Sequence, residues 1–201
     1  MKNNPIIFLD VDGVFNCQLF YTERYAHLNR FDGIPFYKVV KKYLRKLYNV
    51  KGKVKDCDIL NYDYYRSQMC EKRIKWFNQL CKDIDAVVVI SASMRSGKSI
   101  EQLQDIFNHC GGTFTIIGKT ERLGYERGIE IAKWLRDNID VETHGVNYYD
   151  FFKYAIIDDD SDMLLNQRFN FFQTDNYSGL TPNTCYKIKR FITGRTFGVS
   201  V

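Results

Sequence analysis

The chain has 201 residues, of which 45% are hydrophobic, so it can bury one sizeable core and we expect a single domain over residues 1–201. It contains no run of the roughly 20 apolar residues that a bilayer span needs, and the apolar run at residues 6–9 leaves no room for a preceding secretory signal. We therefore expect a cytoplasmic protein without membrane contact. The formal net charge of +5 favours a polyanionic or phosphorylated partner, and the 6 cysteines lack the spacing of a zinc or redox site.

The first predicted element is a strand over residues 6–9 that runs directly into two carboxylates, Asp10 and Asp12. Because every position of the run is apolar, we expect a central strand of a parallel sheet that is covered on both faces. Ligands bind beyond the carboxyl ends of such strands, and the turn at Gly13 would carry the second carboxylate round beside the first. The pair therefore suits an attacking group next to a proton donor.

A long segment over residues 16–68 follows, and we interpret it as a cap-like insertion over the site. Its periodicity predicts one helix, at residues 36–48, which is rich in lysine and arginine. We place Tyr62, Tyr64 and Tyr65 in a loop near the end of the insertion. Tyrosines beside positive charge can stack on bases, although aromatic residues more often pack in a core.

Helices and strands alternate along the rest of the chain. Helices are predicted at residues 70–81, 100–109, 128–138 and 182–192, and strands at residues 86–90, 114–117, 154–157 and 170–172. This alternation predicts an α/β fold, a doubly wound, Rossmann-like parallel sheet of about five strands with helices on both faces.

Polar side chains follow three of these strands where each strand ends: Asp10 and Asp12, Ser91, and Asp158 with Asp159. In a parallel sheet these ends share one edge, so we expect the side chains to lie together. Carboxylates that stay ionised together need a cation, and oxygen ligands select Mg²⁺. With that charge neutralised, one carboxylate could attack a phosphoryl group, while a serine hydroxyl and backbone amides hold its oxygens and a basic side chain offsets the developing charge.

This order of strand ends resembles the haloacid dehalogenase (HAD) superfamily of aspartate-nucleophile phosphatases. In that superfamily the first motif is a strand followed by Asp-x-Asp, the second a strand ending in Ser or Thr, and the fourth a strand ending in acidic residues. The finer pattern is similar to a phage and bacterial branch that is associated with Swiss Army Knife RNA repair proteins. The likeness is carried by the sequences FLDVDGVFN (8–16), ISASMR (90–95), RGIEI (127–131), IDDDSD (157–162) and TD with GLT (174–181).

The resemblance implies that Asp10 is a nucleophile that forms an aspartyl-phosphate. It implies that Asp12 protonates the leaving oxygen and then deprotonates the attacking water. The implied cofactor is Mg²⁺, held by the Asp10 carboxylate, the backbone carbonyl of Asp12, and Asp158 or Asp159.

The resemblance also implies residues that bind the phosphoryl group: Ser91 in contact with it, and Ser93 and Arg95 close behind. The third motif of the superfamily is a lysine or arginine upstream of the fourth motif. We favour Arg127 for this role because it opens the helix that leads into that strand. Lys119 and Lys133 are the alternatives.

The family likeness and the basic and aromatic residues of the insertion predict a phosphomonoesterase for a nucleotide or a terminal phosphate of RNA or DNA. Two alternatives from other classes stay open. Residues 92–99 match a relaxed P-loop, in which Lys98 would bind a nucleoside triphosphate for a kinase or NTPase, although Ala92 stands where the stricter pattern has Gly. The other alternative is a non-catalytic, nucleic-acid-binding module of the same fold.

Overall fold

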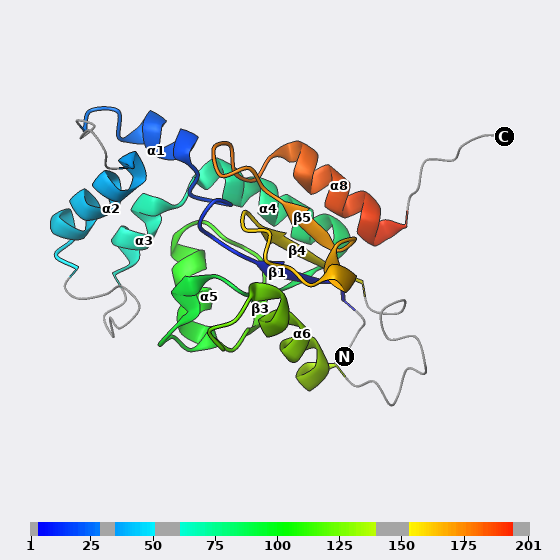
Figure 1. The fold of residues 1–201 in the computed structure, drawn as a ribbon. Helices are drawn as coiled ribbons and strands as arrows, with labels where there is room; N and C mark the ends of the chain where they lie inside the picture. The colour runs from blue at the N-terminus through cyan, green and yellow to red at the C-terminus, as the bar shows by residue number, and fades with distance from the viewer. Residues whose placement is uncertain (1–3, 29–34, 51–60, 140–152, 195–201) are drawn as a thin grey trace.

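Five parallel strands form the centre of the structure, a computed structural model that describes residues 4–28, 35–50, 61–139 and 153–194. The strands are β1 (Ile6–Leu9), β2 (Val87–Ile90), β3 (Ile116–Lys119), β4 (Tyr154–Asp158) and β5 (Phe171–Gln173). They lie in the order β3-β2-β1-β4-β5, and every neighbouring pair is parallel (Figure 1). The predicted parallel sheet is confirmed, with β1 at its centre.

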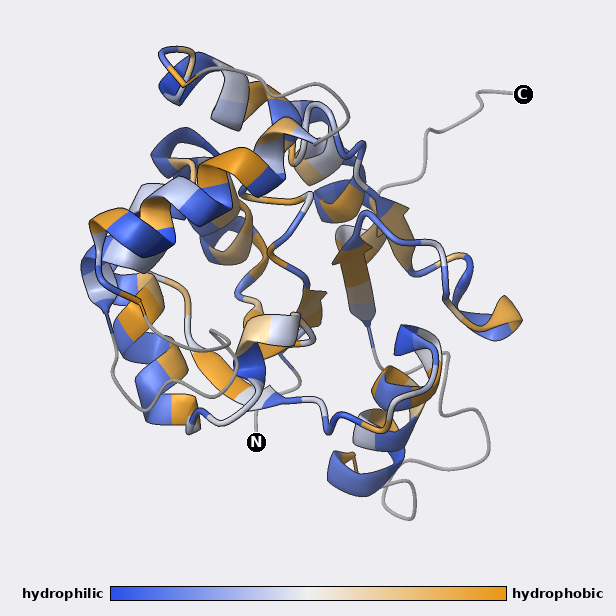
Figure 2. Ribbon diagram, turned by 60° about the vertical axis from the view of Figure 1, so that its left-hand side comes forward, coloured by the Kyte–Doolittle hydropathy of each residue, from blue (hydrophilic) through white to orange (hydrophobic). Residues whose placement is uncertain are grey.

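Helices cover both faces of this sheet. On one face lie α4 (Glu71–Ile84), α5 (Ile100–His109) and α8 (Pro182–Thr193), whose apolar side chains share a core with alternate residues of β1. On the other face lies α6 (Arg127–Asn138), where the rings of Trp134 and Phe8 pack edge to face with centroids 5.5 Å apart. Figure 2 shows the hydrophobic strands between the two helical layers. Side chains alternate along a strand, so an all-apolar strand can serve two cores, and the predicted doubly wound fold is confirmed.

The path of the chain marks one place in the sheet as a binding site. From β1 the chain moves outward to β2 and β3, and it then crosses back through α6 to β4 on the opposite side of β1. The direction of winding therefore reverses between β1 and β4. Ligands of open parallel sheets bind at such a switch point, beyond the carboxyl ends of the strands.

Three further helices lie beyond the carboxyl end of β1 (Figure 1). In the chain they follow β1 and precede α4. They are α1 (Gln18–Arg24), α2 (Phe36–Leu47) and α3 (Tyr62–Gln68). The predicted helix at 36–48 is present as α2, and its buried Val40 and Leu44 belong to the same core as the sheet residues. Residues 29–34 and 51–60 of the predicted insertion lie outside the described residues.

Two sequence-based expectations for local structure are wrong. Tyr64 and Tyr65 lie on α3 and are buried, where we expected a loop, because Asn61 caps this short helix by accepting a hydrogen bond from the backbone N–H of Tyr64 at 2.9 Å. The strand expected from residue 114 starts at Ile116, because the Phe114 ring instead turns against Phe77, with centroids 4.8 Å apart.

The helices of the described part of the chain are short, and α4 is the longest of them at 14 residues. None combines the length and the apolar character that crossing a membrane would require.

Candidate active site

The ends of β1, β2 and β4 bring Asp10, Ser91 and Asp158 to one edge of the sheet. The backbone N–H of Asp10 donates to the Ile157 carbonyl at 2.9 Å, and that of Ser91 donates to the Leu9 carbonyl at 3.0 Å. The hydrogen-bond ladder of the sheet therefore continues one residue past β1 and β2. These two residues are held by backbone contacts as well as by packing, as strand positions are.

Three carboxylates converge at this edge. One oxygen each of Asp10, Asp158 and Asp159 lies within 4.8 Å of the others. Burial, and next the charge of Asp158, raises the pKa of Asp10 well above its usual value, while burial raises the pKa of Asp158 to about 7 despite the nearby Arg127. Asp158 Oδ2 accepts no hydrogen bond from any described group. The three carboxylates together could hold a metal ion, for which oxygen ligands of this kind are suited.

Arg127 is the basic side chain that the structure brings to these carboxylates. Its Nη1 lies 3.2 Å from Asp10 Oδ1, and its Nε lies 3.7 Å from Asp158 Oδ2. Burial alone would lower the pKa of Arg127, but the two carboxylates hold it above its usual value. The backbone N–H of Arg127 donates to Asp162 Oδ2 at 2.9 Å, which fixes the start of α6 beside the loop after β4.

The other two candidates for the third motif are engaged elsewhere. Lys133 lies midway along α6 at the surface, where it pairs with Asp137 and, at 3.4 Å, with Glu121. Lys119 ends β3, and its ammonium donates to the Lys98 carbonyl. Of the three, Arg127 is the one that pairs with Asp10 and Asp158.

The Asp12 carboxylate is held by Asn16 and Lys41 and is not one of the three grouped carboxylates. Its side chain is 55% exposed, and Oδ1 accepts hydrogen bonds from Asn16 Nδ2 at 2.7 Å and from Lys41 Nζ at 2.9 Å. Burial acts to raise the pKa of Asp12, but the charge and hydrogen bond of Lys41, with the Asn16 hydrogen bond, bring it below its usual value. Asn16 and Lys41 therefore hold the Asp12 carboxylate in its ionised form at one side of the cavity.

Gly13 makes the tight approach between the first and fourth motifs possible. Its φ is +74°, and a Cβ at this position would lie 2.2 Å from Cγ of Asp159. The backbone N–H of Gly13 donates to Asn16 Oδ1 at 3.1 Å, so Asn16 holds both the turn and the Asp12 carboxylate. The Gly13 signal was visible in the sequence, whereas the role of Asn16 was not predicted.

Ser91 is fully buried, and its Oγ has no hydrogen-bond partner among the described residues. A buried hydroxyl without a partner costs free energy, so its presence beside the carboxylates favours a ligand that completes it. Ser93 lies two residues further on, at the start of the short helix η2 (Ser93–Arg95), where it lines the cavity described below.

The guanidinium of Arg95, which we predicted to lie close behind the phosphoryl group, is hydrogen-bonded within the fold. Its guanidinium forms a buried ion pair with Glu130 and donates to the carbonyls of Ala92 and Thr120, at 2.8 Å each. Further bonds go to the carbonyls of Ser91 and Glu121. With all three nitrogens so engaged, Arg95 fastens the loop after β2 to the loop after β3 and to α6, and it holds Ser91 in place through the backbone.

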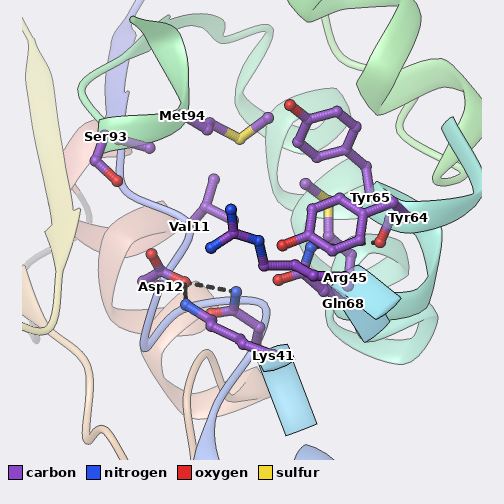
Figure 3. Close-up of a pocket in the computed structure, with 12 residues that line it drawn as sticks. Val11, Asp12, Lys41, Arg45, Tyr64, Tyr65, Gln68, Ser93 and Met94 are labelled. Atoms are coloured by element: carbon purple, nitrogen blue, oxygen red, sulfur yellow. Dashed lines mark hydrogen bonds and ion pairs between the residues drawn. The ribbon is translucent and has the colours of Figure 1, made fainter. Parts of the chain in front are cut away.

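A cavity of about 270 Å³ lies between this edge and the insertion (Figure 3). Its walls include Val11, Asp12 and Ser93 from the sheet edge and Lys41, Arg45 and Tyr64 from the insertion. Lys41 and Arg45 were not predicted as site residues. The sequence does contain a pattern that could have identified them. Lys41 and Arg45 are one helical turn apart and directly follow the apolar Val40 and Leu44, so the lysine and the arginine both lie next to the buried face of α2.

The contacts of residues 92–99 favour a structural role over the P-loop interpretation. Lys98 is buried, with its Nζ 5.7 Å from the centroid of the Tyr65 ring. The Ser99 hydroxyl caps α5 by accepting from the backbone N–H of Gln102 at 3.2 Å, and the Gln102 side chain accepts from the Ser99 N–H at 2.8 Å. The two side chains that would hold phosphate and metal in a P-loop are thus used by the fold itself.

A comparison with protein families finds a family that matches most of this chain. The family model described as HAD domain in Swiss Army Knife RNA repair proteins matches residues 6–185, from β1 into α8. The match includes the insertion, the carboxylate edge and Arg127. No curated protein and no solved structure gave a significant match.

Proposed function

Since the chain belongs to the family of HAD domains in Swiss Army Knife RNA repair proteins, a family of the hydrolase or phosphatase type, we propose that it is a magnesium-dependent phosphomonoesterase. The observation that carries the proposal is the group formed by the buried Asp10 and Asp158 and the half-buried Asp159, beside Arg127. A binding module would have no use for a carboxylate as buried and as costly to ionise as Asp10.

In the first step, a carboxylate oxygen of Asp10 attacks the phosphorus atom and the bond from phosphorus to the leaving oxygen breaks. Asp12 donates its proton to that oxygen, so the product leaves as an alcohol. Arg127, 3.2 Å from Asp10 Oδ1, orients the nucleophile and offsets charge on the phosphoryl oxygens. The free hydroxyl of Ser91 donates to one of these oxygens.

In the second step, water attacks the phosphorus of the aspartyl-phosphate and gives its proton to Asp12. The bond from phosphorus to the Asp10 oxygen breaks, which releases inorganic phosphate and restores both carboxyl groups. Asn16 and Lys41 hold the Asp12 carboxylate through both steps.

The residues that would hold Mg²⁺ are Asp10, Asp158 and Asp159, with the backbone carbonyl of Asp12. The fit rests on the convergence of three carboxylate oxygens and on the unbonded Oδ2 of Asp158. When bound, the ion would screen the repulsion between the nucleophile and the anionic phosphoryl group. As the substrate we propose a nucleotide or a terminal phosphate of RNA or DNA, because the cavity beside Asp12 combines basic and aromatic side chains.

Phosphate release tests the proposal, measured for the wild type and for Asp10→Asn with Mg²⁺ and with EDTA. The substrates are mononucleotides, sugar phosphates and oligonucleotides with 3′ or 5′ phosphates. We expect release that requires Mg²⁺ and falls by about four orders of magnitude in Asp10→Asn. Asp160→Asn is the matched control, since Asp160 is exposed and its hydrogen bond to Asp158 comes from its backbone N–H, which the substitution keeps.

Two outcomes would contradict the proposal. Undiminished release by Asp10→Asn would exclude an aspartyl-phosphate, and a wild type inactive on every monoester would favour the binding module. A sugar phosphate as the sole good substrate would reject the nucleotide assignment alone.

A further inference from the structure

The cavity beside Asp12 is where the leaving group of the proposed reaction must lie. A proton donor acts on the leaving oxygen, so the leaving group extends from Asp10 past Asp12. The carboxylate of Asp12 forms part of the wall of the cavity of about 270 Å³. The side chains that form the other walls therefore indicate the chemical class of the leaving group. This inference rests on the proposed function.

Arg45 brings a positive charge into this cavity. Figure 3 shows its guanidinium pointing from α2 into the space between Asp12 and Met94. The side chain is half-buried, and it forms no hydrogen bond or ion pair with any described residue. Lys41, one helical turn earlier, is by contrast already paired with Asp12 at 2.9 Å. A guanidinium held at the edge of solvent without a counter-ion is well suited to bind an anionic group of a ligand.

The remaining walls suit a flat organic group. Tyr64 and Tyr65 approach from the insertion, Met69 lies directly after it, and Val11 and Met94 approach from the sheet edge. The rings of Tyr64 and Tyr65 lie edge to face, with centroids 5.7 Å apart, so they form one aromatic wall. Aromatic and thioether side chains of this kind accept the face or edge of a base.

The positive charge continues outward along α2. Lys38 and Lys42 line a second hollow of about 300 Å³ on the outer surface, and they share it with Lys41 and Arg45. Positive charge therefore extends from Asp12 to the surface of the insertion. Such a path follows the phosphates of a chain better than it fits a small neutral alcohol.

We propose that Arg45 binds a second phosphate of the substrate, so that the leaving group is itself a nucleoside phosphate. The substrate class is then a nucleotide that carries two phosphates, as in a nucleoside bisphosphate or the phosphorylated end of an oligonucleotide. The scissile phosphate lies at Asp10, the nucleoside lies against Tyr64 and Tyr65, and the second phosphate pairs with the Arg45 guanidinium.

Kinetics on matched substrates test this assignment. Adenosine 3′,5′-bisphosphate is compared with the adenosine 3′- and 5′-monophosphates and with p-nitrophenyl phosphate. We expect the wild type to prefer the bisphosphate by about tenfold or more in kcat/KM. Arg45→Gln should lose this preference through a higher KM and keep its activity on p-nitrophenyl phosphate. Lys46→Gln is the control, because Lys46 follows Arg45 on α2 but is exposed and lines neither hollow.

A binding measurement separates this inference from the proposed reaction. The dissociation constant of adenosine 3′,5′-bisphosphate is measured by calorimetry for Asp10→Asn and for Asp10→Asn with Arg45→Gln. We expect about tenfold weaker binding by the double variant and little change for the monophosphates. Equal binding of the bisphosphate by both proteins, no binding by either, or a wild type indifferent to the second phosphate would overturn the role of Arg45. If the wild type releases no phosphate but binding still depends on Arg45, the proposed reaction is rejected and the role of Arg45 stands.

Discussion

The carboxylate edge of the sheet and the cavity under the insertion share Asp12, but they are built in different ways. At the edge, Asp10 and Ser91 are held by backbone hydrogen bonds to neighbouring strands and are almost fully buried. In the cavity, Lys41 and Arg45 reach in from a 12-residue helix as partly exposed side chains. Under the proposed function, the chemistry takes place at the backbone-held edge, and the side chains of the cavity choose the substrate. Changes at the edge should therefore have larger effects than changes in the cavity.

The largest effect is expected at the contact between Arg127 and the carboxylates. Arg127→Met should lower kcat by about a thousandfold, because the nucleophile loses a charged partner at 3.2 Å and the phosphoryl oxygens lose a cation. Steady-state phosphate release measures this change. Lys133→Met is the control on the same helix, since Lys133 pairs with surface carboxylates. An equal loss in the two variants would contradict the assignment of the third motif to Arg127.

The next largest effect is expected at the buried ion pair between Arg95 and Glu130. Arg95→Met should lower the free energy of unfolding by about 3 kcal/mol, because it leaves Glu130 buried without its partner. Urea denaturation measures the loss. Adding Glu130→Leu removes the unpaired buried charge and should restore part of the stability. If Arg95 instead bound phosphate, Arg95→Met would unfold like the wild type and have a raised KM.

Removing Mg²⁺ should make stability depend on pH in a direction set by the buried carboxyls. Burial raises the pKa of Asp158 from 3.8 to about 7, so between these values the folded protein keeps a proton that the unfolded chain has lost. The free energy of unfolding in EDTA should therefore fall as pH rises through this window, by an amount on the order of a few kcal/mol.

Urea denaturation at about pH 5 and about pH 8, in EDTA and in Mg²⁺, measures this dependence. At the higher pH the buried carboxyls lose their protons, and Mg²⁺ would neutralise them instead, so Mg²⁺ should stabilise the protein more at pH 8 than at pH 5. In EDTA, Asp158→Asn should make the free energy of unfolding depend less on pH. A metal-free protein that gains stability from pH 5 to pH 8 would contradict the account of this group.

The sequence predicted the edge better than the cavity for a physical reason. Apolar runs identify strands locally, and the carboxyl ends of parallel strands must meet, so the proximity of Asp10, Ser91 and Asp158 follows from topology. The partners of a long side chain do not follow from topology. Arg95 meets Glu130, 35 residues away, and Lys41 meets Asp12, 29 residues away. The short helix α3 was also missed, since its tyrosines are buried by tertiary packing with no clear helical period.

The smallest effect is expected for Lys41, because its ion pair with Asp12 joins side chains that are 32% and 55% exposed. Lys41→Met should change kcat/KM for p-nitrophenyl phosphate by less than about tenfold at its optimum. The pH profile should respond more clearly. Lys41 helps to lower the pKa of Asp12, so its loss raises that pKa, and Asp12 keeps the proton it must donate to a higher pH.

The alkaline limb of the kcat/KM profile should therefore move to higher pH in Lys41→Met and stay in place in Lys46→Met, where an exposed lysine of the same helix is removed. A limb that moves to lower pH would show that Lys41 does not act through the proton of Asp12. An unmoved limb with a KM raised for the bisphosphate alone would instead place Lys41 with Arg45 as a phosphate ligand. That result would mean that the substrate-binding side chains of α2 reach up to Asp12, the proposed proton donor.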